Sequence, residues 1–282
     1  MPSSTTLAVP TLAAGVANIP RLGFGTWQLR GEACAEIVSA ALQLGYTHVD
    51  TAQGYGNEAA VGEGLVASGI DRNTVFVTTK VQPQYMAPAD LERSVDASLE
   101  KLRVDRIDLL LLHWPNPEVA LAGTIRALNA VKRDGRAAHI GLSNFPTALL
   151  DEAWRLTTEP FAAEQFEYHP YLDQRVMLKA LRNRGMAAIA YCPLALGKIV
   201  GDPVIEEIAR ARGRTAAQVT LRWLLQQDGV AAIPKTARIE RLRENLAALE
   251  FTLTAEEMQR MGTLARPGSR LINEPQWVAD WD

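Results

Sequence analysis

The chain has 282 residues, of which 48% are hydrophobic, and a formal net charge of −3 from 29 basic and 32 acidic residues. A charge this small, with both signs mixed along the chain, provides no long-range field to attract nucleic acid or an anionic membrane, so neither partner is expected. The length suits one large domain or two small ones, because α/β barrels use this much sequence as a single unit.

The only two cysteines are Cys34 and Cys192. They are too few and too far apart in sequence for a disulfide framework, which favours buried, structural thiols in a reducing compartment. The N-terminus has no basic segment followed by an apolar run, and no apolar stretch reaches membrane-spanning length. We therefore expect a cytoplasmic protein.

Eight short apolar segments alternate with longer segments of helical period. The expected strands are Leu22–Thr26, Tyr46–Ala52, Val75–Lys80, Ile107–His113, His139–Asn144, Ala163–Tyr168, Ala187–Cys192 and Val230–Lys235. Continuously apolar strands are typical of a parallel sheet that is covered on both faces. The pattern predicts an α/β fold, a (β/α)8 TIM barrel, formed by residues 1–282 as a single domain.

The helical segments carry their own signals. The first places Cys34, Ile37, Val38, Ala41 and Leu42 on one stripe before Gly45 ends it. Further helices are expected to end at glycines, namely Gly69, Gly135, Gly185 and Gly213. Two capping boxes mark later helix starts, and they pair Thr215 with Gln218 and Thr254 with Glu257.

The two ends of the chain lie outside the eight units. Residues 5–20 are short and rich in turn residues, which predicts a β-hairpin covering the barrel bottom. A short C-terminal tail from about Arg266 has no clear period and carries Trp277 and Trp281.

Polar residues follow the ends of three successive strands. In such a barrel the C-terminal strand ends and the loops after them form the site, so Asp50, Lys80 and His113 should share one rim with Tyr55, which lies between two glycines. Each has an ordinary alternative: a structural histidine, an Asp50–Lys80 ion pair, or a tyrosine in a simple turn. The convergence of all four favours a catalytic site.

These four groups could donate a proton from a phenol. The pKa of an unperturbed tyrosine is about 10, and a neighbouring ammonium at Lys80 should lower it. Asp50 would keep Lys80 protonated and in place. A neutral His113 could donate from Nε2 to a carbonyl oxygen and orient it.

Such a site suits reduction of a carbonyl by hydride, which requires a nicotinamide cofactor. The chain has no G-x-G-x-x-G motif at a strand-to-helix turn, so the barrel itself would have to bind it. The best phosphate site follows the last strand, where Lys235, Thr236, Arg238 and Arg241 crowd a helix start. A solvated charged face is the alternative for that segment.

The sequence resembles the aldo-keto reductases from Ile19 to about Leu253. The resemblance is carried by DTAxxYGNE at 50–58, TTK at 78–80, LLHWP at 111–115, GLSNF at 141–145, QxEYHP at 165–170, and IPKT with RxxEN at 233–245. It implies a monomeric barrel that uses NADPH, with Asp50, Tyr55, Lys80 and His113 matching the catalytic tetrad.

The resemblance also implies a set of cofactor contacts. Ser143, Asn144 and Gln165 match positions that hold the nicotinamide carboxamide, and Tyr191 matches the aromatic residue that stacks on its ring. The ribose and pyrophosphate positions match Gly25, Thr26 and the loop from Leu194 to Lys198, with Asp50 also among the contacts. The 2′-phosphate and adenine positions match Lys235, Thr236, Arg241, Glu244 and Asn245.

Two residues depart from the family pattern. Glu164 stands where the family often has Asn, and Cys192 stands where Ser commonly follows the stacking tyrosine. Neither removes a member of the tetrad, but both could change affinity for the cofactor.

The expected substrate is small and polar, because the loop from Gln82 to Met86 and the tail are short. Trp27, Tyr55, His113 and Trp114 would line its pocket, whereas Trp281 could either join them or dock on the barrel surface. Within the family the sequence resembles bacterial 2,5-diketo-gluconate reductases of the B type, which also reduce methylglyoxal.

Two alternatives from other functional classes stay open. One is an NADPH-binding regulatory subunit with little turnover, as in relatives that pair with ion channels. The other is a metal-dependent barrel hydrolase, which the strand ends do not favour because they lack clustered His and carboxylate ligands, so no metal is expected.

Overall fold

The main sheet consists of eight parallel strands in the order β10-β9-β8-β7-β6-β5-β4-β3. The computed structural model describes residues 9–15, 17–278 and 280–282. The eight strands are β3 (Phe24–Gly25), β4 (His48–Asp50), β5 (Phe76–Val81), β6 (Ile107–Leu112), β7 (Ala137–Ser143), β8 (Phe161–Glu167), β9 (Ala187–Tyr191) and β10 (Val230–Ala232). Each of these strands lies beside its neighbour in sequence, as successive strand–helix units require.

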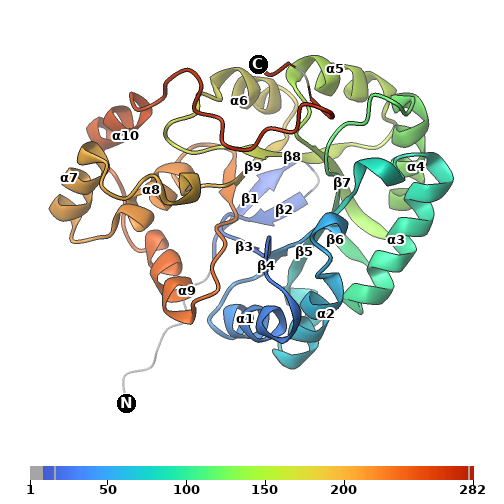
Figure 1. The fold of residues 1–282 in the computed structure, drawn as a ribbon, viewed down its shortest axis with the longest axis horizontal. Helices are drawn as coiled ribbons and strands as arrows, with labels where there is room; N and C mark the ends of the chain where they lie inside the picture. Colours follow the sequence, from blue (N-terminus) through green and yellow to red (C-terminus); the bar gives the residue numbers. More distant parts are fainter. Residues whose placement is uncertain (1–8, 16, 279) are drawn as a thin grey trace.

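The sheet closes on itself where its first and last strands meet. Parallel bridges join Leu22 to Ala232 and Gly25 to Lys235, and the Gly25 amide donates to the carbonyl of Pro234 at 3.1 Å. A Cβ on Gly25 would lie 2.8 Å from the carbonyl oxygen of Ile233, so this approach requires glycine. The predicted (β/α)8 barrel is confirmed (Figure 1).

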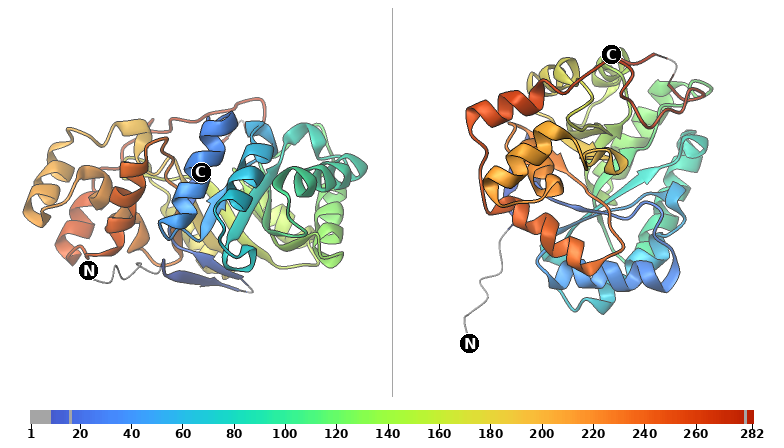
Figure 2. Two further views of the ribbon diagram at one scale, coloured as in Figure 1. Left: turned by 90° about the horizontal axis from the view of Figure 1, so that it is seen from below. Right: turned by 60° about the vertical axis from the view of Figure 1, so that its left-hand side comes forward.

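Helices surround the barrel (Figures 1 and 2), and apolar residues of helices and strands share one buried hydrophobic cluster. They are α1 (Gly31–Gln43), α2 (Glu58–Ala67), α3 (Pro88–Leu102), α4 (Leu121–Arg133), α5 (Thr147–Leu156), α6 (Arg175–Arg182), α7 (Pro203–Arg212), α8 (Ala216–Leu225), α9 (Ile239–Leu246) and α10 (Ala255–Gly262). In α1 the buried residues are the five of the predicted stripe. Both predicted capping boxes are present, at the starts of α8 and α10. No helix in the described ranges is long and apolar enough to cross a membrane.

Short 3₁₀ turns lie between several of the larger elements. They are η1 (Gln53–Tyr55), η2 (Arg72–Thr74), η3 (Pro83–Tyr85), η4 (Ala195–Gly197) and η5 (Ala247–Leu249). Three of them, η1, η3 and η4, follow barrel strands, so they lie at the end of the barrel where the predicted site residues gather.

The N-terminal hairpin closes the other end of the barrel. Strands β1 (Thr11–Ala14) and β2 (Ala17–Pro20) pair antiparallel, and the hairpin lies below the barrel in the left view of Figure 2. Its inward side chains, including Leu12 and Ile19, share a buried cluster with Leu111 and Ile189 from the barrel strands. The predicted hairpin is confirmed, although residues 5–8 of its segment lie outside the described residues.

The observed strand ends differ from the prediction by a few residues. The largest difference is at the last strand, where Val230–Lys235 was expected and regular pairing stops at Ala232. Pro234 lacks a backbone N–H, which interrupts the ladder before the isolated bridge at Lys235. The polar residues after each strand keep their places at the rim.

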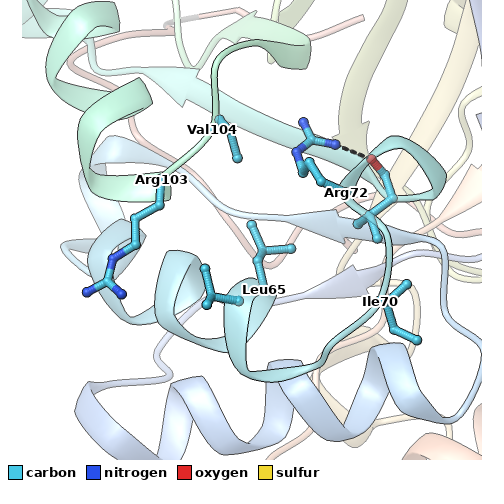
Figure 3. Close-up of a pocket in the computed structure, with 7 residues that line it drawn as sticks. Leu65, Ile70, Arg72, Arg103 and Val104 are labelled. Atoms are coloured by element: carbon cyan, nitrogen blue, oxygen red, sulfur yellow. Dashed lines mark hydrogen bonds between the residues drawn. The ribbon is translucent and has the colours of Figure 1, made fainter.

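A small cavity of about 110 Å³ lies between the end of α2 and the segments that lead into β5 and β6 (Figure 3). Leu65, Ile70 and Val104 form its apolar wall. The guanidinium of Arg72 is occupied, since it donates to the carbonyl of Val75 and pairs with Asp108. This cavity precedes the strands, at the opposite end from the residues that the sequence marks as catalytic.

The C-terminal tail crosses the rim of the barrel after α10 (Figure 1). Glu167, at the end of β8, accepts hydrogen bonds from the amides of Leu271 and Ile272, both at 2.8 Å. The Asp282 carboxylate accepts from the amide and hydroxyl of Thr147 at the start of α5. These contacts fix the tail beside the strand ends that carry the candidate site.

Candidate active site

The four predicted catalytic residues lie together at the C-terminal rim. Asp50 ends β4, Lys80 lies near the end of β5, and His113 directly follows β6. Tyr55 ends η1, and Gly56 then reverses the chain with a φ of +63°, a conformation that favours glycine. Adjacent parallel strands therefore deliver all four side chains to one place.

A buried ion pair forms the centre of this group. The Lys80 Nζ lies 2.6 Å from Asp50 Oδ1, 2.8 Å from the carbonyl of Thr51 and 3.4 Å from the Tyr55 hydroxyl. The side chains of Lys80 and Asp50 are 0% and 1% exposed. Gln165 donates to the second Asp50 oxygen at 2.7 Å, so both carboxylate oxygens are hydrogen-bonded. The ordinary alternative, an ion pair between Asp50 and Lys80, is therefore present, and this pair is buried and in contact with Tyr55.

The electrostatics of Tyr55 differ from the prediction. Burial acts to lower the pKa of Lys80, but Asp50 and Tyr55 together outweigh it, so the pKa is raised and the ammonium persists. Burial also raises the pKa of Tyr55, and Lys80 offsets only part of that rise. The expectation that Lys80 lowers the pKa of Tyr55 overall is therefore wrong, because desolvation of the phenolate outweighs the nearby charge. The phenol stays protonated at neutral pH.

His113 lies beside Tyr55 and is neutral. The two ring centroids are 5.6 Å apart at an interplanar angle of 77°. Burial, and secondly the charge of Lys80, lower the pKa of His113 to about 3. A neutral imidazole is the form in which His113 could donate from Nε2, and its backbone is fixed by hydrogen bonds to Val81 and Asn144.

The low pKa predicts that His113 does not titrate near neutrality. Its imidazole ¹⁵N resonances should stay at neutral-form shifts from about pH 8 to pH 5, whereas an unperturbed histidine changes near pH 6.5. Histidine-selective NMR of the native protein and of His113→Asn would assign and follow the signal. A midpoint close to 6.5 for the signal lost in the variant would contradict this environment.

Four further predicted residues lie at the ends of β7, β8 and β9. Asn144 has a φ of +63° and bridges neighbours, since its Nδ2 donates to the carbonyl of His113 at 3.0 Å and its Oδ1 accepts from the Tyr191 hydroxyl at 2.8 Å. It also donates to Ser143 Oγ at 3.1 Å. Gln165 lies beside Ser143 on the neighbouring strand, and Tyr191 is half-buried. Amide and hydroxyl groups beside a tyrosine fit a nicotinamide.

The next predicted group lies along the loops after β3 and β9. Thr26 is buried and its hydroxyl donates to the carbonyl of Asp50 at 3.0 Å, adjacent to Gly25. Leu194 precedes η4, in which Leu196 has a φ of +53°, and Lys198 follows it with an exposed side chain. An exposed lysine on such a loop is compatible with a phosphate ligand.

Cationic side chains surround the start of α9, as predicted. Lys235 and Arg241 are exposed, and among the residues that the structure describes neither takes part in an ion pair. Thr236 is buried, with its Oγ accepting from the Arg238 amide at 3.0 Å. This donor set at a helix start fits a phosphate group.

The predicted adenine contacts lie farther along α9. The Glu244 carboxylate accepts from the Thr215 hydroxyl at 2.6 Å, and Asn245 is buried. Glu244 is thus held by a hydrogen bond, and both residues follow the cationic side chains along the same helix.

The two residues that depart from the family pattern are Glu164, which is buried, and Cys192, which is half-buried. Glu164 accepts from the Phe145 amide at 2.9 Å, and burial raises its pKa well above the usual range. Burial raises the pKa of Cys192 to about 12, which keeps it as an unreactive thiol.

The tryptophans predicted to line the pocket differ in exposure. Trp27 is 39% exposed on the loop after β3, whereas Trp114 is buried. Trp281 meets Trp114 edge to face, with ring centroids 6.0 Å apart, and its indole donates to Asn273 at 3.1 Å. The tail tryptophan therefore packs on the residue after His113 instead of docking on the outer barrel surface.

Two structural contributors escaped the sequence interpretation. Asn57 joins the loops of the site, because its amide donates to the carbonyls of Thr26 and Leu29 while its Oδ1 accepts from Thr51. Glu167 anchors the tail. Both lie inside the quoted motifs, so a polar residue in a segment expected to be buried was the available signal.

No group of three or more metal-binding side chains occurs in the described part of the chain.

The sequence is similar to a known protein family and to named relatives. The sequence matches the model of the Aldo/keto reductase family over residues 21–266. It is 37% identical over 267 residues to the methylglyoxal reductase DkgB of Escherichia coli O157:H7, which covers 94% of this chain and 99% of that protein. An aldo-keto reductase of Mycolicibacterium smegmatis is 39% identical over 270 residues, with 95% of each chain covered.

Solved structures agree with the sequence comparison. A crystal structure assigned to a 2,5-diketo-D-gluconic acid reductase B superposes with a TM-score of 0.95 at 48% identity, covering 97% of this chain and 98% of the other. A single-residue variant of Gox0644, crystallised with NADPH, gives a TM-score of 0.86 at 34% identity over 92% of this chain and 94% of the other. The chain therefore belongs to the aldo/keto reductase family, whose members are oxidoreductases.

Proposed function

We propose that the protein reduces small aldehydes and ketones to alcohols with NADPH. The observation that carries the proposal is the Lys80 ammonium, held 2.6 Å from Asp50 and 3.4 Å from the Tyr55 hydroxyl, beside a neutral His113. In this group Tyr55 can donate a proton to an oxygen while His113 stays neutral. NADPH, when bound, supplies the hydride that no side chain can provide.

Each catalytic side chain has a separate task in this proposal. Tyr55 donates its phenolic proton to the substrate oxygen, and the adjacent Lys80 stabilises the phenolate that remains. Asp50 keeps Lys80 charged and positioned. His113, neutral and close to Tyr55, donates a hydrogen bond that orients the carbonyl oxygen.

The cofactor contacts follow the same rim. Ser143, Asn144 and Gln165 would hold the carboxamide, and Tyr191 would support the ring. Gly25, Thr26, Leu194 and Lys198 would flank the ribose and pyrophosphate. The cations at the start of α9 would bind the 2′-phosphate, and Glu244 with Asn245 would contact the adenine. The NADPH complex of the Gox0644 variant, a relative at 34% identity, supports NADPH as the cofactor.

The 2′-phosphate assignment predicts a change in cofactor selectivity. Arg241→Ala should raise the Kd for NADPH by about 10-fold or more and leave that for NADH within about 2-fold, because only NADPH carries the phosphate that the guanidinium can pair with. Quenching of tryptophan fluorescence on cofactor binding measures both constants. Arg243→Ala, on the same helix, is a control for lost charge. Equal losses for both cofactors would count against this role.

Substrate identity is proposed from the named relatives. Methylglyoxal and 2,5-diketo-D-gluconate are the first compounds to test, since similar proteins bear the names of their reductases. Loss of NADPH absorbance with these compounds, aromatic aldehydes and β-keto esters would rank them. Tight NADPH binding with no turnover on any carbonyl would instead favour a regulatory subunit.

We also propose a single-domain, monomeric, cytoplasmic enzyme. Family resemblance and the one continuous barrel support a single unit. Sedimentation equilibrium across a range of concentrations would test the monomer, and a mass near twice the 30.8 kDa of the chain would contradict it.

A further inference from the structure

Gln53 begins the turn that carries the proposed proton donor. It is the first residue of η1, which ends at Tyr55, and its side chain is half-buried. Within the turn the Tyr55 amide donates to the carbonyl of Ala52 at 3.0 Å. The Gly56 amide donates to the carbonyl of Gln53 at 3.1 Å. Both bonds lie inside the turn, so they shape it without attaching it to the neighbouring helix or strand.

The side-chain amide of Gln53 attaches the turn on one side to α3. Its Nε2 lies 3.1 Å from the carbonyl oxygen of Ser94, 3.0 Å from Ser94 Oγ and 3.1 Å from Ser98 Oγ. Ser98 is fully buried and lies one helical turn after Ser94, so the two residues share one face of the helix. A single amide nitrogen therefore meets three acceptors on that face of α3.

The oxygen of the same amide attaches the turn to the segment after β5. Gln53 Oε1 accepts from the backbone amide of Gln82 at 3.1 Å. Gln82 directly follows β5, the strand that carries Lys80. A backbone carbonyl on one side and a backbone N–H on the other fix which end of the amide is nitrogen, and neither anchor is a rotatable side chain. One side chain therefore joins η1 both to a helix and to a strand end.

The turn held in this way packs directly against His113. A Cβ on Gly54 would lie 3.6 Å from His113 Nδ1 and 3.5 Å from Gln82 Cγ. The rings of Tyr55 and His113 meet edge to face, with centroids 5.6 Å apart. The Tyr55 hydroxyl lies 3.4 Å from the Nζ of Lys80. A shift of the turn away from its two anchors would change both separations.

We propose that Gln53 is a positioning residue for carbonyl reduction, acting through Tyr55. The inference rests on the proposed function and adds the side chain that holds its proton donor in line. Reaction rates depend steeply on geometry, and a displacement of about 1 Å can cost about 10²-fold. A glutamine suits this task because its amide supplies a donor and an acceptor at a fixed separation, without adding a charge beside the Asp50–Lys80 ion pair.

Gln53→Met tests this role, because it nearly keeps the length of the side chain and removes both attachments. The single-turnover rate of NADPH oxidation, measured with the carbonyl compound that the native holoenzyme reduces fastest, should fall about 10–100-fold. The Kd for NADPH should stay within about 2-fold, since none of the hydrogen-bond partners of Gln53 is a proposed cofactor contact. Gln53→Asn keeps the amide but is one methylene too short to span both anchors, so it should lose about 3-fold or more.

Gln226→Met is the matched control for lost stability. Gln226 is half-buried like Gln53, and its amide also joins two backbone groups, since it donates to the carbonyl of Leu253 at 2.8 Å and accepts from the Leu253 amide at 2.9 Å. It follows α8 and precedes β10, so it lies at the opposite end of the barrel from the rim. Both variants should lower the melting temperature by similar amounts, whereas only Gln53→Met should slow the single turnover.

A double variant shows whether Gln53 acts through Tyr55. In Tyr55→Phe the phenolic proton is already absent, so adding Gln53→Met should lower the remaining single-turnover rate by less than about 3-fold. A further loss of about 10–100-fold would give Gln53 a role apart from Tyr55 and overturn the proposal.

The other outcomes are also distinct. Native single-turnover rates in both Gln53→Met and Gln53→Asn, or an equal loss of rate in Gln226→Met, would overturn positioning by Gln53 and leave carbonyl reduction intact. If Gln53→Met does not fold, the same comparisons are made with Gln53→Asn. A native holoenzyme that reduces no carbonyl compound of the panel would instead refute the proposed function.

Discussion

Tyr55→Phe should lower kcat for carbonyl reduction by about 10²–10⁴-fold, the range of a single general acid, while the protein still binds NADPH. The change removes only the hydroxyl that lies 3.4 Å from Lys80. Its ring can keep the edge-to-face contact with His113, so the fold and the pocket should persist. Single-turnover rates with NADPH and methylglyoxal would measure the loss at the reduction step itself.

Tyr85→Phe provides the matched control. Tyr85 ends η3 on the same rim, is 41% exposed and belongs to no contact of the proposed site. Removal of the Tyr85 hydroxyl should leave kcat within about 2-fold of the native value. Near-native turnover in Tyr55→Phe would remove the tyrosine from the mechanism, whatever Tyr85→Phe does.

Most of the barrel could be predicted because each unit repeats the same local signal. Apolar strands such as Ile107–Leu112 are bounded by charged or turn residues, and α1 shows a regular stripe that the structure buries. Strand lengths were less predictable, because pairing depends on the neighbouring strand. The interruption near Pro234 is an example, since Gly25 from the other end of the barrel supplies the partner.

The candidate site also has a part that the sequence predicts and a part that it does not. The gathering of Asp50, Lys80 and His113 follows from parallel topology alone, because neighbouring strands end at one rim. The pKa of Tyr55 could not be predicted, since its direction depends on how much desolvation competes with Lys80. That balance is a property of packing and has no signature in the spacing of residues.

The tail was the least predictable part. Its sequence has no period, and its position depends on contacts with residues more than one hundred positions away, such as Leu271 with Glu167 and Asp282 with Thr147. A segment without regular secondary structure is placed by specific hydrogen bonds, which single-sequence patterns do not encode.

Lys80→Met should reduce stability as well as activity. The substitution leaves Asp50 buried without its cationic partner and held only by Gln165, which should lower the free energy of unfolding by about 3–5 kcal/mol. It also removes the ammonium that stabilises the Tyr55 phenolate, so kcat should fall at least about 10²-fold. Urea unfolding followed by circular dichroism, together with turnover, measures the two effects separately.

A double variant and a surface control show why the two effects differ. Lys80→Met with Asp50→Asn removes both charges, so stability should recover by about half or more, whereas activity should stay low because the phenolate still lacks its cation. Lys132→Met breaks a pair of similar length with Glu159 that is 15% and 24% exposed, and should cost about 1 kcal/mol or less. Recovery of turnover in the double variant would mean that Lys80 only neutralises Asp50; continued loss would mean that the buried charge is retained for the chemistry of Tyr55.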